Sequence, residues 1–204
     1  MAGKPVRIGV LALQGDFEAH RKALELTGAA AVEVRTAADL DELDGLIIPG
    51  GESTTMLKLL AEEQLFEPLH AFGQRQPIFG TCAGAILLAS EVLHPVQPSL
   101  GLMDMTVERN GYGRQIDSRI AQIELEGGAA EAVFIRAPII RRVGPTAKIL
   151  ASYAGMPVLL EQGRHLAATF HPELSRGSHV HQRFITKVLQ ENEKPALSAT
   201  LEVK

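Results

Sequence analysis

The only cysteine of the chain, Cys82, lies in the stretch IFGTCAGAIL, with Gly80 and Gly84 two positions to either side. The apolar run before it predicts a buried strand, and the residues after it predict a helix. A strand that turns abruptly into a helix holds the turn residue above the sheet, and the helix N-terminus favours thiolate over thiol. Cys82 therefore stands where a nucleophile would be activated, although a lone cysteine is more often a small buried apolar residue.

A thiolate nucleophile needs a base and a group that orients the base. The stretch TFHPEL supplies His171 and Glu173 after an apolar strand. In extended backbone, positions i and i+2 point to the same side, and Pro172 stiffens the link between them. A His-x-Glu pattern is weak by itself, but its place at a strand end, where open α/β sheets bind ligands, favours a catalytic role.

A glycine pair follows another apolar run in IIPGGESTT, at Gly50 and Gly51. Two readings are open, a phosphate-binding loop and an oxyanion hole beside a nucleophile. The Walker pattern with its lysine is absent, and no GxGxxG follows the first strand. The presence of Cys82 favours the oxyanion hole.

Other polar residues carry less weight. His179 and His181 are two apart on a predicted helix and do not share a face, which argues against a zinc pair. Asp16 and His20 are expected at a helix start and on the surface, with a position near the cleft left open. Gln14, at the end of the first strand, could contact an oxyanion or a partner.

The elements that position these residues alternate between strand and helix. Strands are expected at 6–13, 31–35, 45–51 and 77–82, and helices at 15–28, 37–43, 53–65, 67–75 and 83–92, with Ser53 as a helix N-cap. Because the strands are continuously apolar, the pattern predicts a mostly parallel sheet covered on both faces. The fold class is α/β.

The second half of the chain is less regular. Residues 100–125 contain polar interruptions and glycines, which predict strands joined by an exposed loop around 110–115, a plausible docking surface. Four more short strands, some of them antiparallel, are expected at 132–138, 147–155, 156–163 and 164–173, before an amphipathic helix at 178–193. We expect one domain over residues 1–193 and a mobile tail over 194–204.

Composition limits the classes of partner. The chain has 204 residues, 46% hydrophobic and 22% charged, with a net charge of −4, and this balance gives no reason to expect nucleic acid or an anionic membrane. A single cysteine excludes disulfide stapling and a cysteine-rich zinc site. The single cysteine fits a reducing cytoplasm, so a cytoplasmic location is expected, and the apolar run at 8–13 is too short for a typical signal peptide.

The motifs taken together resemble the class I glutamine amidotransferases, with Cys, His and Glu in the same chain order. LALQGDFEAH, GLIIPGGESTTM, IFGTCAGAILLA, LGLMDMTVERNGYGRQIDS, FIRAP and FHPEL are similar to one branch, the glutaminase subunits of pyridoxal 5′-phosphate synthases. The pairing of GGEST with VERNGYGRQ is specific to that branch. The resemblance implies a flavodoxin-like, three-layer amidotransferase fold.

The resemblance also implies an activity, a partner and site residues. The chain would hydrolyse L-glutamine and pass ammonia to a separate synthase subunit that makes pyridoxal 5′-phosphate, with no cofactor or metal of its own. By similarity, the catalytic residues are Cys82, His171 and Glu173, and the oxyanion hole is formed at Gly51 and Ala83. The positions that contact L-glutamine are Gly50, Gly51, Glu52, Arg109, Ile135 and Arg136.

Alternatives remain open for several of these residues. Arg109 can hold the α-carboxylate of glutamine, and Glu52 can face its α-ammonium or simply cap a helix. Arg136 could act mainly through its backbone. The chain could also serve another amidotransferase pathway, or be a non-catalytic regulatory module, although the complete triad and VERNGYGRQ argue against both.

Overall fold

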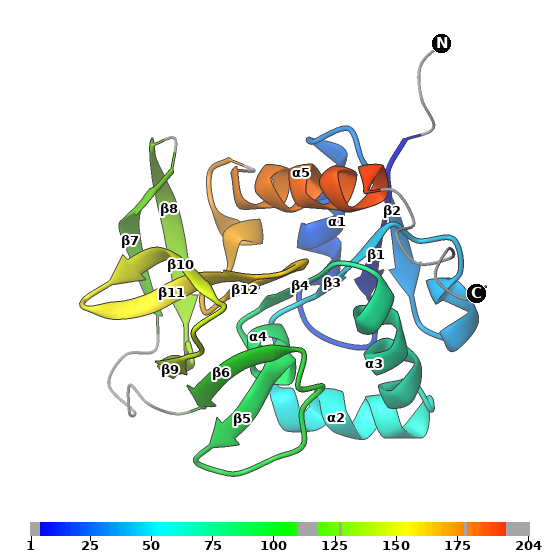
Figure 1. Ribbon diagram of the computed structural model, residues 1–204, viewed down its shortest axis with the longest axis horizontal. Helices are drawn as coiled ribbons and strands as arrows, with labels where there is room; N and C mark the ends of the chain where they lie inside the picture. The colour runs from blue at the N-terminus through cyan, green and yellow to red at the C-terminus, as the bar shows by residue number, and fades with distance from the viewer. Residues whose placement is uncertain (1–4, 110–117, 127, 178, 195–204) are drawn as a thin grey trace, which may run out of the picture.

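The computed structural model describes residues 5–109, 118–126, 128–177 and 179–194. Its largest sheet has seven strands. The strands of this sheet are β1 (Arg7–Leu11), β2 (Ala30–Val34), β3 (Gly45–Ile48), β4 (Ile78–Thr81), β10 (Lys148–Tyr153), β11 (Met156–Gln162) and β12 (His165–Ala168). Their order is β10-β11-β12-β4-β3-β1-β2 (Figure 1). The five strands from β12 to β2 are parallel, and β10, β11 and β12 pair antiparallel.

Helices cover both faces of this sheet (Figure 1). They are α1 (Phe17–Glu25) and α5 (His179–Glu193) on one face, and α2 (Ser53–Glu62), α3 (Phe66–Arg75) and α4 (Ala83–Leu88) on the other, with short 3-10 turns η1 (Ala37–Leu40) and η2 (Pro172–Leu174). Successive residues of β3 point to opposite cores: Ile47 packs with Leu24 and Phe184, and Ile48 packs with Met56. The prediction of a mostly parallel sheet buried on both faces, with some antiparallel strands, is confirmed.

Two smaller sheets flank the main one (Figure 1). The first contains β5 (Ala89–Leu93), β6 (Met103–Glu108) and β9 (Ile139–Val143), and the second is the antiparallel pair β7 (Ser118–Leu125) and β8 (Gly128–Ile135). The expected exposed loop at 110–115 lies outside the described residues, as do residues 195–204 of the expected tail. Among the described residues, no helix has both the length and the apolar character needed to cross a membrane.

The sequence prediction of one helix over 83–92 is wrong in its second half. The helix ends at Leu88, and Ala89 begins β5, which pairs parallel with β6. Ser90 Oγ donates a hydrogen bond to the carbonyl of Met105 at 3.1 Å. A short apolar run has no periodicity that separates helix from strand, so the partner strand decides. The sequence prediction also missed β9, which pairs with β6.

The strand register brings the predicted site residues to one edge. In the parallel pair β4 and β12, Thr81 lies opposite Ala168, and the N–H of Cys82 donates to the carbonyl of Ala168 at 2.8 Å. On the other side of β4, Ile48 of β3 lies opposite Gly80. The residues that follow these three strands therefore meet at their carboxyl ends, where parallel sheets bind ligands.

Candidate active site

Cys82 forms a sharp turn between β4 and α4. Its backbone has φ +48° and ψ −102°, a region that non-glycine residues rarely occupy, and its side chain is buried. Such strain concentrates at functional sites, and this strand-turn-helix geometry is typical of a nucleophile. The thiol faces the carbonyl oxygen of Ile135 at 3.9 Å. The close approach of α4 to β3 depends on Gly84, where a Cβ would lie 2.0 Å from the carbonyl oxygen of Ile48.

His171 and Glu173 form a buried pair beside this turn. His171 Nδ1 lies 2.7 Å from Glu173 Oε1, and the Glu173 side chain has no exposed surface. Burial lowers the pKa of His171, but hydrogen bonds to Cys82 and Glu173 and their negative charges outweigh it and raise the pKa to about 10. The imidazole therefore holds its proton beside Cys82, as a thiolate–imidazolium pair requires.

A pocket of about 260 Å³ opens over Cys82 and His171. All six positions expected to contact glutamine line it, namely Gly50, Gly51, Glu52, Arg109, Ile135 and Arg136. A larger pocket of about 330 Å³ lies between the β7–β8 hairpin and α5, and none of the predicted site residues lines it. We place the site at the smaller pocket, because that is where the titratable residues converge.

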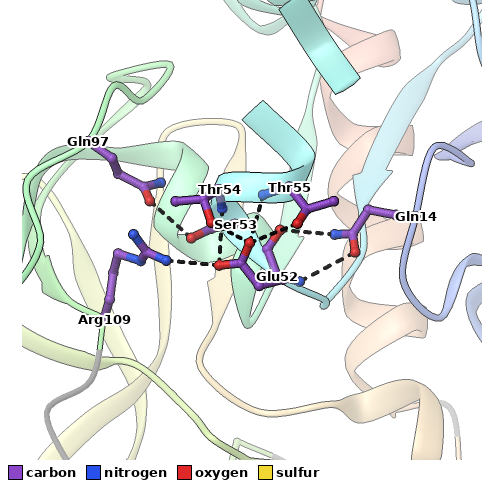
Figure 2. A network of polar contacts seen from close by, with 7 residues as sticks. All are labelled: Gln14, Glu52, Ser53, Thr54, Thr55, Gln97 and Arg109. Carbon is purple, nitrogen blue, oxygen red and sulfur yellow. Dashed lines mark hydrogen bonds and ion pairs between the residues drawn. The ribbon is translucent and has the colours of Figure 1, made fainter. Parts of the chain in front are cut away.

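The glycine pair packs directly against the triad. A Cβ at Gly50 would lie 2.3 Å from His171 Cε1, so the imidazole needs a glycine there. Gln14 binds the backbone of Glu52, the residue after the glycine pair. Its Oε1 accepts from the N–H of Glu52 at 3.4 Å, and its Nε2 donates to the carbonyl of Glu52 at 3.3 Å (Figure 2). The contact that the sequence left open for Gln14 is therefore with the backbone beside Gly51.

Glu52, rather than Ser53, is the N-cap of α2, so the sequence prediction of the cap is off by one residue. The Glu52 carboxylate accepts from the N–H groups of Thr54 at 3.2 Å and Thr55 at 2.7 Å (Figure 2). Although partial burial works in the opposite direction, the hydrogen bonds from both threonines lower the pKa of Glu52 to about 2. Ser53 Oγ donates instead to Gln97 Oε1 at 3.0 Å.

Arg109 joins this cap to the pocket. Its Nη2 donates to Glu52 Oε1 at 2.9 Å (Figure 2). The Arg109 side chain is 10% exposed. Its Nη1 is buried and has no hydrogen-bond partner among the described residues. A buried cationic donor without an acceptor favours the arrival of an anionic ligand. Arg136 lies exposed on the rim with φ +43°, so its backbone is held in an unusual conformation there.

Asp16, His171 and Glu173 place possible ligand atoms within 4.8 Å of one another. A metal ion requires a neutral imidazole, whereas His171 holds its proton and gives Nδ1 to Glu173. We therefore interpret His171 and Glu173 as part of the triad, and the expectation of no metal stays a prediction. Asp16 is exposed at the N-cap of α1, as expected.

Sequence reasoning placed His20 on the surface, and this is wrong. His20 is fully buried and contacts His181, Thr81 and Glu173. The helical spacing of His20 with Ala23 and Leu24, both of which are buried, was the signal that could have placed it inward. Its partner His181 is 161 positions away, which no local pattern reveals.

Comparison with protein-family models shows which family the chain belongs to. The model of the SNO glutamine amidotransferase family matches residues 10–190. The chain belongs to this family. This family assignment agrees with the motifs found in the sequence, and it confirms the predicted resemblance to the glutamine amidotransferases.

Individual relatives agree with the family assignment. A Solibacter usitatus protein named pyridoxal 5′-phosphate synthase subunit PdxT is 57% identical over 190 residues, covering 89% of this chain and 99% of the relative. A Deinococcus radiodurans protein of the same name is 52% identical, covering 87% and 95%. A crystal structure described as a glutamine amidotransferase is 45% identical with a TM-score of 0.84, covering 89% and 98%. The predicted fold class is therefore confirmed.

Proposed function

We propose that this chain is the glutaminase subunit of a pyridoxal 5′-phosphate synthase, which hydrolyses L-glutamine to glutamate and supplies ammonia to a synthase subunit for vitamin B6 biosynthesis. The observation that carries the activity is the strained Cys82 turn beside His171, whose Nδ1 lies 2.7 Å from Glu173 Oε1. The pathway and the partner follow from the names of the relatives.

Glutamine binds in the pocket over Cys82. Its α-carboxylate meets the guanidinium of Arg109, whose buried Nη1 needs an acceptor. Its α-ammonium lies toward the Glu52 carboxylate, which stays ionised because the backbone and hydroxyls of α2 stabilise its charge. The side-chain amide then extends toward the thiolate.

The Cys82 thiolate attacks the amide carbon and forms a tetrahedral intermediate with a negatively charged oxygen. His171 donates its proton to the departing nitrogen, ammonia leaves, and a thioester remains. The neutral imidazole then takes a proton from water, which attacks the thioester and releases glutamate. Glu173 holds His171 in one tautomer and stabilises its charged form throughout.

The oxyanion is held by the backbone N–H groups of Ala83 and Gly51. Ala83 is the first residue of α4, so its N–H lies outside the hydrogen bonds of the helix. The carbonyl of Gly50 faces Gly15, where a Cβ would lie 1.8 Å from the oxygen. In a trans peptide, the N–H of Gly51 points away from that carbonyl. Loss of one such donor costs about 3 to 4 kcal/mol of barrier.

The glycine pair can act as a switch that the synthase operates. A peptide between two glycines can turn either way at little cost, so the hole can stay incomplete until the partner docks. We expect the isolated chain to hydrolyse glutamine slowly and the complex to hydrolyse it faster. Full activity of the isolated chain would rule this switch out.

The test of the function is a reconstitution with a pyridoxal 5′-phosphate synthase subunit. Glutamate release and product absorbance are followed for the wild type and for Cys82→Ala. We expect Cys82→Ala to abolish both with glutamine, but to leave product formation from added ammonium salt intact. Glutamine-dependent product formation by Cys82→Ala would support a non-catalytic module, and co-purification with another type of synthase would support another pathway.

A further inference from the structure

A line of buried polar side chains continues behind Glu173, away from the pocket. His20 of α1 places Nε2 3.2 Å from Glu173 Oε2 and 3.1 Å from Thr81 Oγ1, and its Nδ1 lies 2.9 Å from Nε2 of His181 on α5. Glu173 and both histidines have fully buried side chains. The line therefore connects two helices on one face of the sheet to the carboxylate that holds His171.

The proton positions along this line follow from the partners. Glu173 Oε2 can only accept, so a lone pair on His20 Nε2 at 3.2 Å would repel it. We therefore assign the His20 proton to Nε2, where it is donated to Thr81 Oγ1 and lies close to the charge of Glu173. His20 Nδ1 is then an acceptor, and His181 must donate to it from Nε2.

His20 and His181 are both neutral. The positive end of the His20 N–H dipole therefore faces Glu173, and neither histidine competes with His171 as a cation beside the Glu173 carboxylate. Burial is the main cause that holds the pKa of His20 well below its usual value. Burial also lowers the pKa of His181 to about 4. Among the described residues, His20 faces Thr81 from β4, Glu173 from η2, His181 from α5 and the ring of Phe79, which lies perpendicular to the imidazole.

The environment of Oε2, the second carboxylate oxygen of Glu173, shows why a polar neighbour such as His20 matters. Oε1 is engaged by His171, whereas Oε2 is buried and has no hydrogen-bond partner among the described residues. Nε2 of His20 lies 3.2 Å from Oε2, a close electrostatic contact that is not aligned as a hydrogen bond. A buried carboxylate oxygen without a donor is costly, and a carboxylate held at one oxygen can rotate about its terminal bond. The His20 dipole favours the one rotation that keeps Oε1 on His171.

We propose that His20, fixed in its tautomer by His181, is a positioning residue that holds Glu173 in the orientation required by the His171–Cys82 pair. This role rests on the proposed glutaminase function. It extends the catalytic machinery beyond the triad to α1 and α5. Neither histidine contacts the substrate pocket, so the role is one of orientation and not of proton transfer to glutamine.

The test uses variants of His20 and a matched control in the reconstituted complex. His20→Leu removes the donor, whereas His20→Gln places an amide N–H near the position of Nε2. The control is His165→Leu, which also removes a buried histidine, one that accepts from the N–H of Ile78 at the opposite end of β4. Thermal melting of each variant measures the general cost of losing a buried imidazole.

We expect His20→Leu to lower kcat for glutamine hydrolysis about 10- to 100-fold, because the buried charge of Glu173 loses a close polar neighbour, with KM nearly unchanged. The alkaline limb of its pH profile should move to lower pH, because a misoriented Glu173 holds the His171 proton less firmly. His20→Gln should recover most of kcat. His165→Leu should lose stability and keep the wild-type kcat and pH profile.

A wild-type pH profile in His20→Leu, with kcat no lower than in His165→Leu, would overturn the proposal. If His20→Leu does not fold, His181→Leu tests the same line, and we expect a smaller loss of kcat and the same direction of pH shift. The pH dependence of Cys82 alkylation in the wild type and variants gives a readout without glutamine. Failure of the function itself would instead appear as a wild-type complex that does not hydrolyse glutamine.

Discussion

Replacing Gly50 with alanine should disable the site without unfolding the protein. The new Cβ would lie 2.3 Å from His171 Cε1 and 2.9 Å from Nδ1. Ordinary van der Waals contact begins at about 3.4 Å, so the imidazole must move by about 1 Å. A misplacement of this size in a catalytic group can cost about 100-fold, and we expect a loss of that order in kcat.

The assay is glutamate release by the complex with the synthase subunit, together with the rate of Cys82 alkylation. Gly28→Ala is the control, because Gly28 has φ +80° and nothing within 4 Å of its added Cβ. That substitution should cost about 1 kcal/mol of stability and no activity. Wild-type kcat in Gly50→Ala would refute the placement of Gly50 against the imidazole.

Three further predictions concern charges at the site and in the core. Glu173→Gln keeps the shape of the side chain but removes its charge, and glutaminase assays should show a loss of about 10²- to 10⁴-fold in kcat; an unchanged kcat would contradict the role of Glu173. Arg109→Lys should raise KM for glutamine about tenfold with a smaller change in kcat, because an ammonium cannot hold Glu52 and a carboxylate as a guanidinium does; an unchanged KM would place the α-carboxylate elsewhere. Burial lowers the pKa of His165 to about 4. As the pH falls below about 6.5, the His165 imidazole is therefore protonated in the unfolded chain before it is protonated in the folded chain. The free energy of unfolding then decreases between pH 6.5 and 4, by about 2 kcal/mol at pH 5. Thermal melting of His165→Gln should therefore be less sensitive to acid than that of the wild type, and equal sensitivity would be the contrary result.

The site was predictable where the chemistry is encoded in short motifs at strand ends. GTCAG and TFHPEL identify Cys82, His171 and Glu173, because each motif follows an apolar strand. The extended backbone expected at His-x-Glu is wrong: Glu173 lies in the 3-10 turn η2, from which its carboxylate still reaches His171. Parallel strands then carry the two motifs to the same edge of the sheet.

The structural features that could not be predicted from the sequence depend on contacts between residues far apart along the chain. The residues after Leu88 form a strand because β6 is available to pair with them. Likewise, His20 is buried because His181, 161 positions away, supplies a polar partner. The capping role of Glu52 was an alternative that the sequence left open, and the hydrogen bonds from the N–H groups of Thr54 and Thr55 decide it. Local patterns do not reveal the distant partners, although the spacing of His20 with Ala23 and Leu24 indicates a side chain that faces inward.

The most direct test of the central claim is the covalent intermediate on Cys82. The complex with the synthase subunit is incubated with glutamine, quenched in acid during turnover, and analysed by mass spectrometry of its peptides. The account predicts one glutamyl group, attached as a thioester, on the peptide that carries Cys82, and none in Cys82→Ala. Steady glutamate release with no adduct on the Cys82 peptide, or equal release by Cys82→Ala, would contradict it.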